Sequence, residues 1–141
     1  MTHAALENLV RIGHLKAEPR NEAESRRMLV MAQTRLADAR LAQLSEEGRF
    51  TSAYNAAHAA ALAALRWHGY RSENRYTVFQ CLPHTLSWQP AQWRVLDSAH
   101  QKRNLAEYEG FLEVDGAQVE ALCQLVGQLI ADVQQLLGSH L

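Results

Sequence analysis

The fold of this chain is decided by residues 50–68, which read FTSAYNAAHAAALAALRWH. Alanine and leucine have high helix propensity, and neither proline nor glycine interrupts the stretch. Apolar residues recur at three- and four-residue steps from Phe50 to Leu65, and Gly69 follows where a helix end favours positive φ. Because so many alanines leave little side-chain bulk, neighbouring helices can approach closely. We predict that this is the central helix of the protein.

Outward from this stretch, cap and turn signals divide the chain into further helices. Asn21 with Glu24 resembles a capping box, and the apolar periodicity after it continues to residues 45–48, Ser-Glu-Glu-Gly, which we expect to stop that helix. Asp115 with Gln118 predicts the start of a last helix with heptad-like apolar spacing to Gly138. Shorter helices are predicted at residues 4–15, closed by Pro19, and at residues 73–82, ended or kinked by Pro83; another begins at Gln89-Pro90.

Helices of these lengths joined by short turns predict an all-α protein, an antiparallel four-helix bundle with short accessory helices. We expect residues 1–20 to form an N-terminal accessory helix or arm and residues 21–141 to form the bundle. The 141 residues, 48% hydrophobic and 21% charged, fit one globular domain that needs no metal or disulfide for stability.

The charge balance limits the function classes. Lys+Arg 14 against Asp+Glu 15 gives a net charge of -1, so no global basic field attracts nucleic acid, and any RNA contact has to be local or lie in an oligomer groove. Cys81 and Cys123 stand apart, without metal-ligand spacing, and are expected to be reduced core residues. We therefore expect no metal site and no cofactor. No leader or membrane-length apolar run is seen, which predicts a cytoplasmic protein without membrane contact.

Functional groups gather at residues 100–108, which read HQKRNLAEY. Cationic, amide and phenolic side chains meet there beside a predicted helix end. On a continuous helix Arg103 and Tyr108 lie about 140° apart around the axis, so both face one ligand only if the helix bends. The ordinary interpretation of Arg103 is a surface ion pair with Glu107 one turn later.

Three segments in order resemble the HEPN (higher eukaryotes and prokaryotes nucleotide-binding) family of small helical bundles. They are residues 49–70, an aromatic and alanine helix closed by Gly69-Tyr70; residues 102–108, KRNLAEY, similar to an Arg-Asn-x-x-x-Tyr element; and the last apolar helix, residues 119–137. The resemblance implies an all-α bundle that forms a homodimer through the helices bearing this element. In many members it also implies a metal-independent endoribonuclease encoded beside a nucleotidyltransferase antitoxin.

In catalytic members of that family an Arg, the polar residue after it and a His four to six positions beyond the Arg meet their symmetry mates in a cleft. Attack of a ribose 2′-OH on the adjacent phosphate needs a base, an acid and a cation. Arg103 and Asn104 match the first two positions, but Tyr108 replaces the His, and a phenol with a pKa of about 10 is a poor base at neutral pH. With Lys102 beside them, the resemblance implies an RNA- or nucleotide-binding homodimer that is weakly catalytic or not catalytic.

Two alternatives stay open. In the first, the protein is a metal-independent endoribonuclease toxin, in which His58 of the central helix or His100 supplies the imidazole; Arg94 and His100 also match an Arg-x5-His spacing. In the second, the chain is a structural protein-interaction module that binds a partner such as a nucleotidyltransferase antitoxin. Arg66, Arg71 and Arg75 flank one turn, and we expect them to form a solvated basic rim that a dimer could extend into an RNA-tracking surface.

Overall fold

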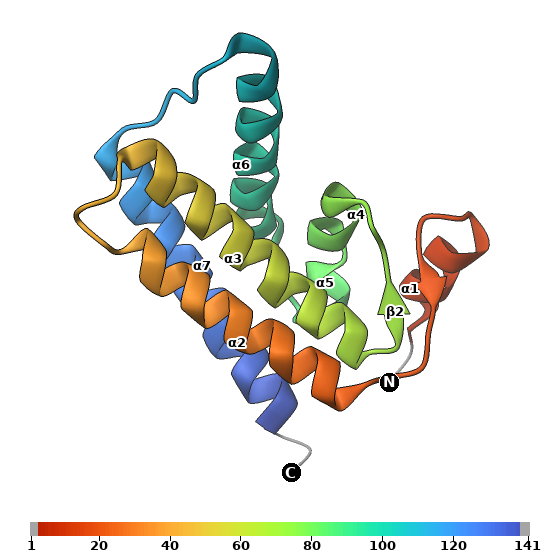
Figure 1. Ribbon diagram of the computed structural model, residues 1–141. Coiled ribbons are helices and arrows are strands. Elements are labelled where there is room, and N and C mark those ends of the chain that lie inside the picture. The colour runs from red at the N-terminus through yellow and green to blue at the C-terminus, as the bar shows by residue number, and fades with distance from the viewer. Residues whose placement is uncertain (1–2, 139–141) are drawn as a thin grey trace.

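The computed structural model describes residues 3–138 and is mostly helical (Figure 1). None of the helices in this part of the chain has the length and apolar composition that crossing a membrane requires. The elements in chain order are α1 (Ala4–Arg11), β1 (Lys16–Ala17), α2 (Glu22–Ala39), α3 (Glu46–Trp67), β2 (Tyr70–Arg71), α4 (Arg75–Gln80), α5 (Leu82–Thr85), α6 (Pro90–Glu109) and α7 (Gly116–Gly138).

Side-chain caps fix the starts of the long helices. The Asn21 side chain accepts a hydrogen bond from the backbone N–H of Glu24 at 3.0 Å, which confirms the predicted N-cap of α2. At α7 the cap is reciprocal: the Gln118 N–H donates to Asp115 Oδ1 at 2.8 Å, and the Asp115 N–H donates to Gln118 Oε1 at 3.0 Å. These bonds satisfy donors that a helix N-terminus otherwise leaves without partners.

The predicted boundary between α2 and α3 is wrong. The sequence Ser-Glu-Glu-Gly at residues 45–48 was expected to stop a helix, but α2 already ends at Ala39, and Ser45 starts α3. The Ser45 hydroxyl accepts from the Gly48 N–H at 2.9 Å. Glu46 and Glu47 then lie in the first turn, where the helix dipole favours negative charge.

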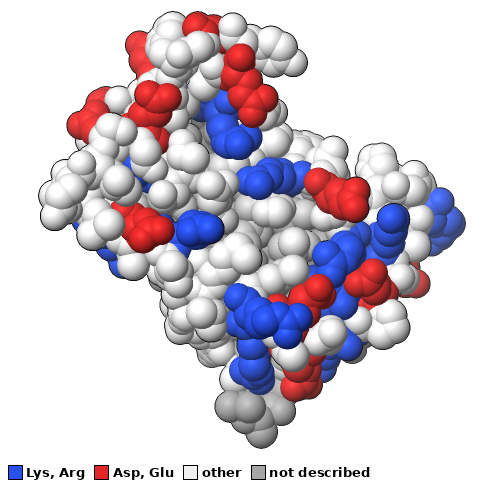
Figure 2. All heavy atoms as spheres, viewed as in Figure 1, with Lys and Arg blue, Asp and Glu red and all other residues white. Residues whose placement is uncertain are grey.

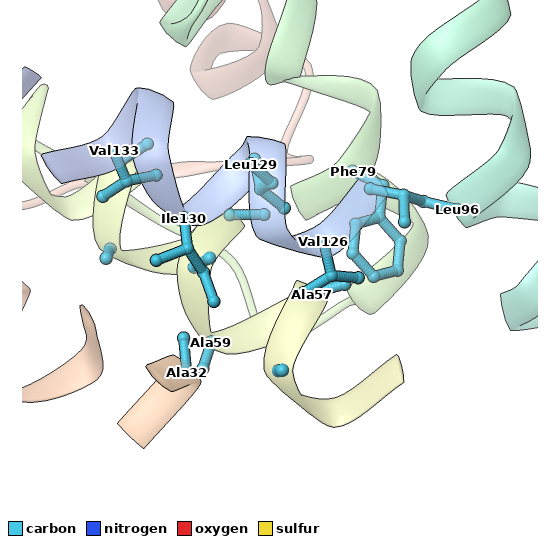
Figure 3. Packing of buried hydrophobic residues seen from close by; sticks show 14 of the residues in the cluster. Ala32, Ala57, Ala59, Phe79, Leu96, Val126, Leu129, Ile130 and Val133 are labelled. Atoms are coloured by element: carbon cyan, nitrogen blue, oxygen red, sulfur yellow. The ribbon is translucent and has the colours of Figure 1, made fainter. Parts of the chain in front are cut away.

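The core lies along α3, which packs against α2 and α7 (Figures 1 and 3). Most alanines of α3 are fully buried, and so are Tyr54, Leu65 and Trp67. The α7 positions at heptad-like spacing, Val119, Leu122, Val126, Leu129 and Val133, are buried as well. The alanine stretch therefore acts as predicted, as the central helix between bulkier neighbours.

Both cysteines are buried and free. Burial raises the pKa of the Cys81 thiol to about 12, because the apolar surroundings disfavour a thiolate. Burial also raises the pKa of Cys123. The predicted role of these side chains as core residues is confirmed.

The N-terminal segment is tied to the far end of α3. β1 pairs with β2 in antiparallel register, Lys16 opposite Arg71, and Leu6 and Leu15 are buried. The Tyr70 hydroxyl donates to the carboxylate of Glu7 at 2.5 Å. The division into an arm at residues 1–20 and a bundle at residues 21–141 stays a prediction.

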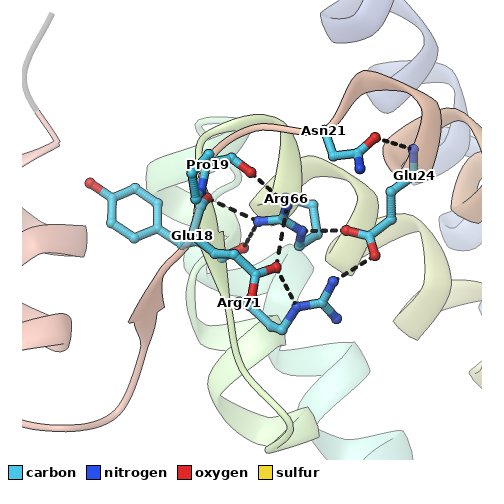
Figure 4. A network of polar contacts seen from close by, with 7 residues as sticks. Glu18, Pro19, Asn21, Glu24, Arg66 and Arg71 are labelled. Atoms are coloured by element: carbon cyan, nitrogen blue, oxygen red, sulfur yellow. Dashed lines mark hydrogen bonds and ion pairs between the residues drawn. The ribbon is translucent and has the colours of Figure 1, made fainter.

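The expectation of a solvated basic rim is wrong for two of its three arginines. Arg66 is only 1% exposed; its guanidinium pairs with Glu24 at 2.5 Å and donates to the carbonyl oxygens of Glu18 and Pro19 (Figure 4). Arg71 pairs with Glu18 at 2.9 Å and with Glu24 at 2.6 Å. Figure 2 shows the resulting mixture of basic and acidic side chains over the start of α2 and the end of α3. Two carboxylates neutralise these two cations, so Arg66 and Arg71 do not form the open basic rim that the sequence predicted.

Helix α6 extends away from the other long helices (Figure 1). It packs on α3, α4 and α5 through its first half, and its buried residues are Leu96 and Ala99. Pro90 occupies the first turn, and Gly110 ends the helix with φ 81°, a left-handed conformation that suits glycine. Val95, Leu105 and Phe111 remain exposed. The candidate site lies on the opposite side of this helix.

Candidate functional site

Polar side chains from three helices meet where α6 crosses α3 and α4. Tyr54 and His58 lie one turn apart on α3, Arg75 begins α4, and the remaining members come from α6. We call this group the Tyr54 cluster; its members are Tyr54, His58, Arg75, His100, Arg103 and Asn104. Figure 2 shows Lys or Arg side chains at the notch between α6 and α4.

A chain of hydrogen bonds runs from the core to the surface through His100. The Tyr54 hydroxyl lies 2.7 Å from His100 Nδ1, and His100 Nε2 lies 3.1 Å from the side-chain amide of Asn104. With the Asn104 amide donating to Nε2, Nδ1 carries the proton and donates to the Tyr54 oxygen; with the amide turned over, both bonds reverse. Either neutral tautomer of His100 is thus held by two partners.

Two arginines share the ring of Tyr54. The guanidinium carbon of Arg75 lies 5.3 Å from the ring centroid, and that of Arg103 lies 5.4 Å from it, both within the range of a cation–π contact. Arg75 also donates to the side-chain oxygen of Asn55 at 3.2 Å. Arg103 pairs with the exposed Glu107 at 3.3 Å, the ordinary ion pair that the sequence predicted.

His58 is partly buried, and its Nε2 atom is inaccessible to solvent. Its ring packs edge-on against Phe79 with centroids 6.2 Å apart, and its Nε2 has no hydrogen-bond partner among the described residues. Burial, assisted by the charge of Arg75, lowers the pKa of His58 to about 4. At neutral pH this imidazole is uncharged.

His100 and Tyr54 are both uncharged at neutral pH, beside the two arginine cations. Burial lowers the pKa of His100, opposed by the carboxylate of Asp97 and assisted by Arg75 and Arg103. Burial also raises the pKa of Tyr54. At neutral pH the cluster therefore contains neutral rings and two guanidinium cations, an arrangement that favours an incoming anion. A neutral imidazole with one exposed side can also accept a proton.

The structure brings only some of the predicted site residues together. Arg103 and Asn104 lie in the Tyr54 cluster, and so does His58, which reaches it within one chain. Lys102 lies elsewhere on α6, where its ammonium donates to the carbonyl oxygen of Glu113 at 2.8 Å. Tyr108 is 89% exposed and lies outside the cluster. The roles predicted for these residues remain predictions.

Sequence reasoning missed how Tyr54 and Arg75 contribute. Tyr54 belongs to the apolar periodicity that predicted the central helix, and it is fully buried, but its hydroxyl also contacts His100. Arg75 was grouped with the salt-bridged Arg66 and Arg71. The only sequence signal was Asn74, whose side chain caps α4 by accepting from the Thr77 N–H at 3.0 Å and so sets the start of that helix beside α3.

Hollows in the surface of the described residues lie outside the cluster. One of about 500 Å³ lies between residues 13–16 and α4 and is lined by His14, Lys16 and Tyr76 among others. Another, of about 350 Å³, separates α6 from the start of α7; Phe50, Val95 and Leu122 make it mainly apolar. Within residues 3–138 no group of three or more His, Cys, Asp or Glu side chains is arranged to hold a metal ion.

No protein-family model, no curated protein sequence and no solved structure matches this chain. The resemblance to the HEPN family therefore rests on the residues quoted from the sequence. The geometry of the Tyr54 cluster supplies the remaining argument for function.

Proposed function

We propose that the protein is a HEPN-like homodimer that binds the phosphate groups of RNA or of a nucleotide at Arg103 and Asn104, with little or no nuclease activity. The observation that carries this proposal is the position of Arg103, whose guanidinium, like that of Arg75, lies over the Tyr54 ring. Its one carboxylate partner is the exposed Glu107. A phosphate can replace that pair at small cost, because exposed ion pairs contribute little stability.

Arginine and asparagine suit this role for different reasons. A guanidinium donates in a planar fork that matches two phosphate oxygens, and the amide of Asn104 adds a neutral donor one residue later. The His100 contact holds that amide in place before a ligand arrives. Since the chain carries a net charge of -1, recognition depends on this local pair of cations and not on a basic field.

The proposed dimer would use the other face of α6. Val95, Leu105 and Phe111 are exposed there, and the apolar hollow between α6 and α7 continues that surface. A second copy packing its own α6 on this surface would bury those side chains and complete a HEPN-like arrangement of α2, α3, α6 and α7. Two Tyr54 clusters would then belong to one particle, and an RNA strand could contact both.

The endoribonuclease alternative is favoured by one observation. His100 offers a neutral imidazole whose Nε2 lies beside Asn104, on the same helix as Arg103. In that reaction Nε2 would take the proton from a ribose 2′-OH, the 2′-oxygen would bond to phosphorus, and the 5′-oxygen would leave and gain a proton from water. Tyr108 would take no part, and the partly buried His58 is a poorer base than His100.

Metal-free RNA cleavage and RNA binding, measured together, test both functions. Purified protein is incubated in EDTA with an RNA that has single-stranded and paired regions, and retention is measured by filter binding. We compare wild type with Arg103→Ala, His100→Ala and Arg27→Ala. The last is the matched control, because Arg27 is an exposed arginine on α2, away from the Tyr54 cluster and from the proposed dimer face of α6.

Binding without cleavage, weakened about tenfold or more by Arg103→Ala and unchanged by Arg27→Ala, supports the proposal. Fragments ending in a 2′,3′-cyclic phosphate that disappear with both Arg103→Ala and His100→Ala would establish the endoribonuclease instead. Neither binding nor cleavage would leave the structural interaction module, for which a nucleotidyltransferase is the partner to test.

A further inference from the structure

Arg75 and Arg103 approach the same aromatic ring from different helices. Both guanidinium carbons lie within 5.4 Å of the Tyr54 centroid, so they are no farther apart than the sum of their two distances to it. Asn55 holds Arg75 through a hydrogen bond at 3.2 Å, and Glu107 holds Arg103 at 3.3 Å. The spacing of the two cations is therefore set by the fold of one chain.

The two cations have fewer carboxylate partners than the pair formed by Arg66 and Arg71, because Glu107 pairs with Arg103 alone. Arg66 and Arg71 share the carboxylates of Glu18 and Glu24. In contrast, Arg75 forms no ion pair with any carboxylate of the described residues. Two like charges that contact the same aromatic ring repel each other, and a bound anion relieves that repulsion. Arg75 and Arg103 thus have one carboxylate between them, Glu107, whereas Arg66 and Arg71 have two.

We propose that each chain holds a complete site for two neighbouring phosphate groups, one bound by Arg103 and the other by Arg75. This inference rests on the proposed function and extends it, because it adds a phosphate-binding residue from α4 and specifies the ligand. Two adjacent phosphates occur in a nucleoside di- or triphosphate and in successive linkages of an RNA strand. The site needs no residue from a second copy, so short ligands bind once per chain.

Tyr54 and His100 act as positioning residues in this site. The ring provides the shared surface for both guanidinium groups, and the 2.7 Å contact between its hydroxyl and His100 Nδ1 fixes the ring relative to α6. Arg75 then determines selectivity. With Arg103 alone the site holds one phosphate, and with Arg75 it holds two.

Calorimetric titration with AMP and ADP in EDTA tests the assignment, because the two nucleotides differ only in the second phosphate. Wild type is expected to bind ADP about tenfold more tightly than AMP, as one additional charge-assisted hydrogen-bonded pair predicts. Arg75→Gln is expected to weaken ADP more than AMP and so to remove this preference, whereas Arg103→Gln weakens both ligands. Arg94→Gln makes the same charge change outside the cluster and alters neither. Oligouridylate of eight residues replaces ADP in a parallel arm.

The outcomes separate the two proposals. If Arg103→Gln weakens binding but Arg75→Gln preserves the ADP preference, the second phosphate site is wrong and the proposed function stands. If Arg103→Gln leaves every affinity unchanged, both proposals fail. If Arg75→Gln lowers the affinity for oligouridylate but not the affinity for ADP, the two phosphates belong to an RNA strand. A stoichiometry of one ligand per two chains overturns the single-chain site.

Circular dichroism checks that each variant folds. Arg75→Lys keeps the charge but not the planar guanidinium, so its preference for ADP over AMP should be intermediate.

Discussion

The hydroxyl of Tyr54 on α3 lies 2.7 Å from Nδ1 of His100 on α6. This contact joins the most deeply buried helix to the one that extends farthest from the core, and α6 buries few other side chains. The rings also stack, with centroids 6.1 Å apart. This polar contact, together with buried Leu96 and Ala99, positions the helix that carries Arg103 and Asn104.

Tyr54→Phe tests the strength of this contact. The substitution keeps the ring and removes the hydroxyl, so the free energy of unfolding should fall by about 1 kcal/mol, the net contribution of one hydrogen bond. Urea unfolding followed by circular dichroism measures the change. Tyr76→Phe is the matched control, since Tyr76 is exposed and contacts the Trp93 ring. Equal stability of Tyr54→Phe and wild type would show that the contact does not hold α6.

The sequence predicted the helices well where a signal was local. Asn21 and Asp115 cap helices as expected, because each cap involves residues three positions apart. The predicted boundary at Ser45 was wrong, because Ser-Glu-Glu-Gly carries signals both for the end and for the start of a helix. Burial of Leu36 and Ala39 together with the Ser45 cap decides between them, and both depend on packing against α3 and α7.

The candidate site was predicted less well, because it depends on contacts between distant segments. Arg103 and Asn104 were found from their motif, but Arg75 lies 28 positions before Arg103, and only the fold places both at Tyr54. Arg66 looked like a rim residue, yet the carboxylate of Glu24, 42 positions away, makes it a buried ion pair. No local pattern distinguishes these two arginines.

The lowered pKa of His58 should make the protein less stable in mild acid. Its pKa is about 4 in the folded chain and about 6.5 when unfolded, so between these values the unfolded chain binds a proton that the folded chain excludes. The contribution is fully present above pH ~6.5 and is lost as the pH falls toward the folded value, by about 3 kcal/mol in total. Urea unfolding at pH 7 and at pH 4 measures it.

The His58→Leu variant isolates this contribution. Other groups also titrate in the same range, so the comparison is the change in stability between the two pH values, wild type against variant. Removal of the imidazole should reduce that change by about 3 kcal/mol, while exposed His84→Gln should not. The same acid sensitivity in wild type and His58→Leu would contradict the assignment.

Removal of the buried Arg66 cation should lower the free energy of unfolding substantially. Arg66→Met removes the ion pair to Glu24 and the donors to the carbonyl oxygens of Glu18 and Pro19, which should lower the unfolding free energy by about 3 kcal/mol. Arg35→Met is the control, because its pair with Asp38 at 3.7 Å is exposed and contributes little. Thermal and urea unfolding measure both. Similar small losses for the two variants would mean that the network in Figure 4 stabilises nothing.

A substitution at Leu105 tests where the proposed dimer forms. Its side chain is 56% exposed on α6, and Val95 and Phe111 are exposed on the same helix and just beyond it. Leu105→Glu would bury a charge in the contact between two copies, so the dimer dissociation constant should rise about tenfold or more, as for an interface residue worth at least 1.4 kcal/mol. Sedimentation equilibrium measures the constant.

Leu41→Glu is the matched control for that experiment, because Leu41 is similarly exposed but lies in the turn between α2 and α3, far along the chain from α6. Dimerisation weakened by Leu105→Glu alone assigns the interface to α6. A dimer that both variants preserve would place the contact elsewhere, and a monomeric wild type would refute the homodimer. ADP binding once per chain should survive Leu105→Glu, since Arg75 and Arg103 belong to the same copy, whereas RNA affinity should fall with the loss of a second cluster.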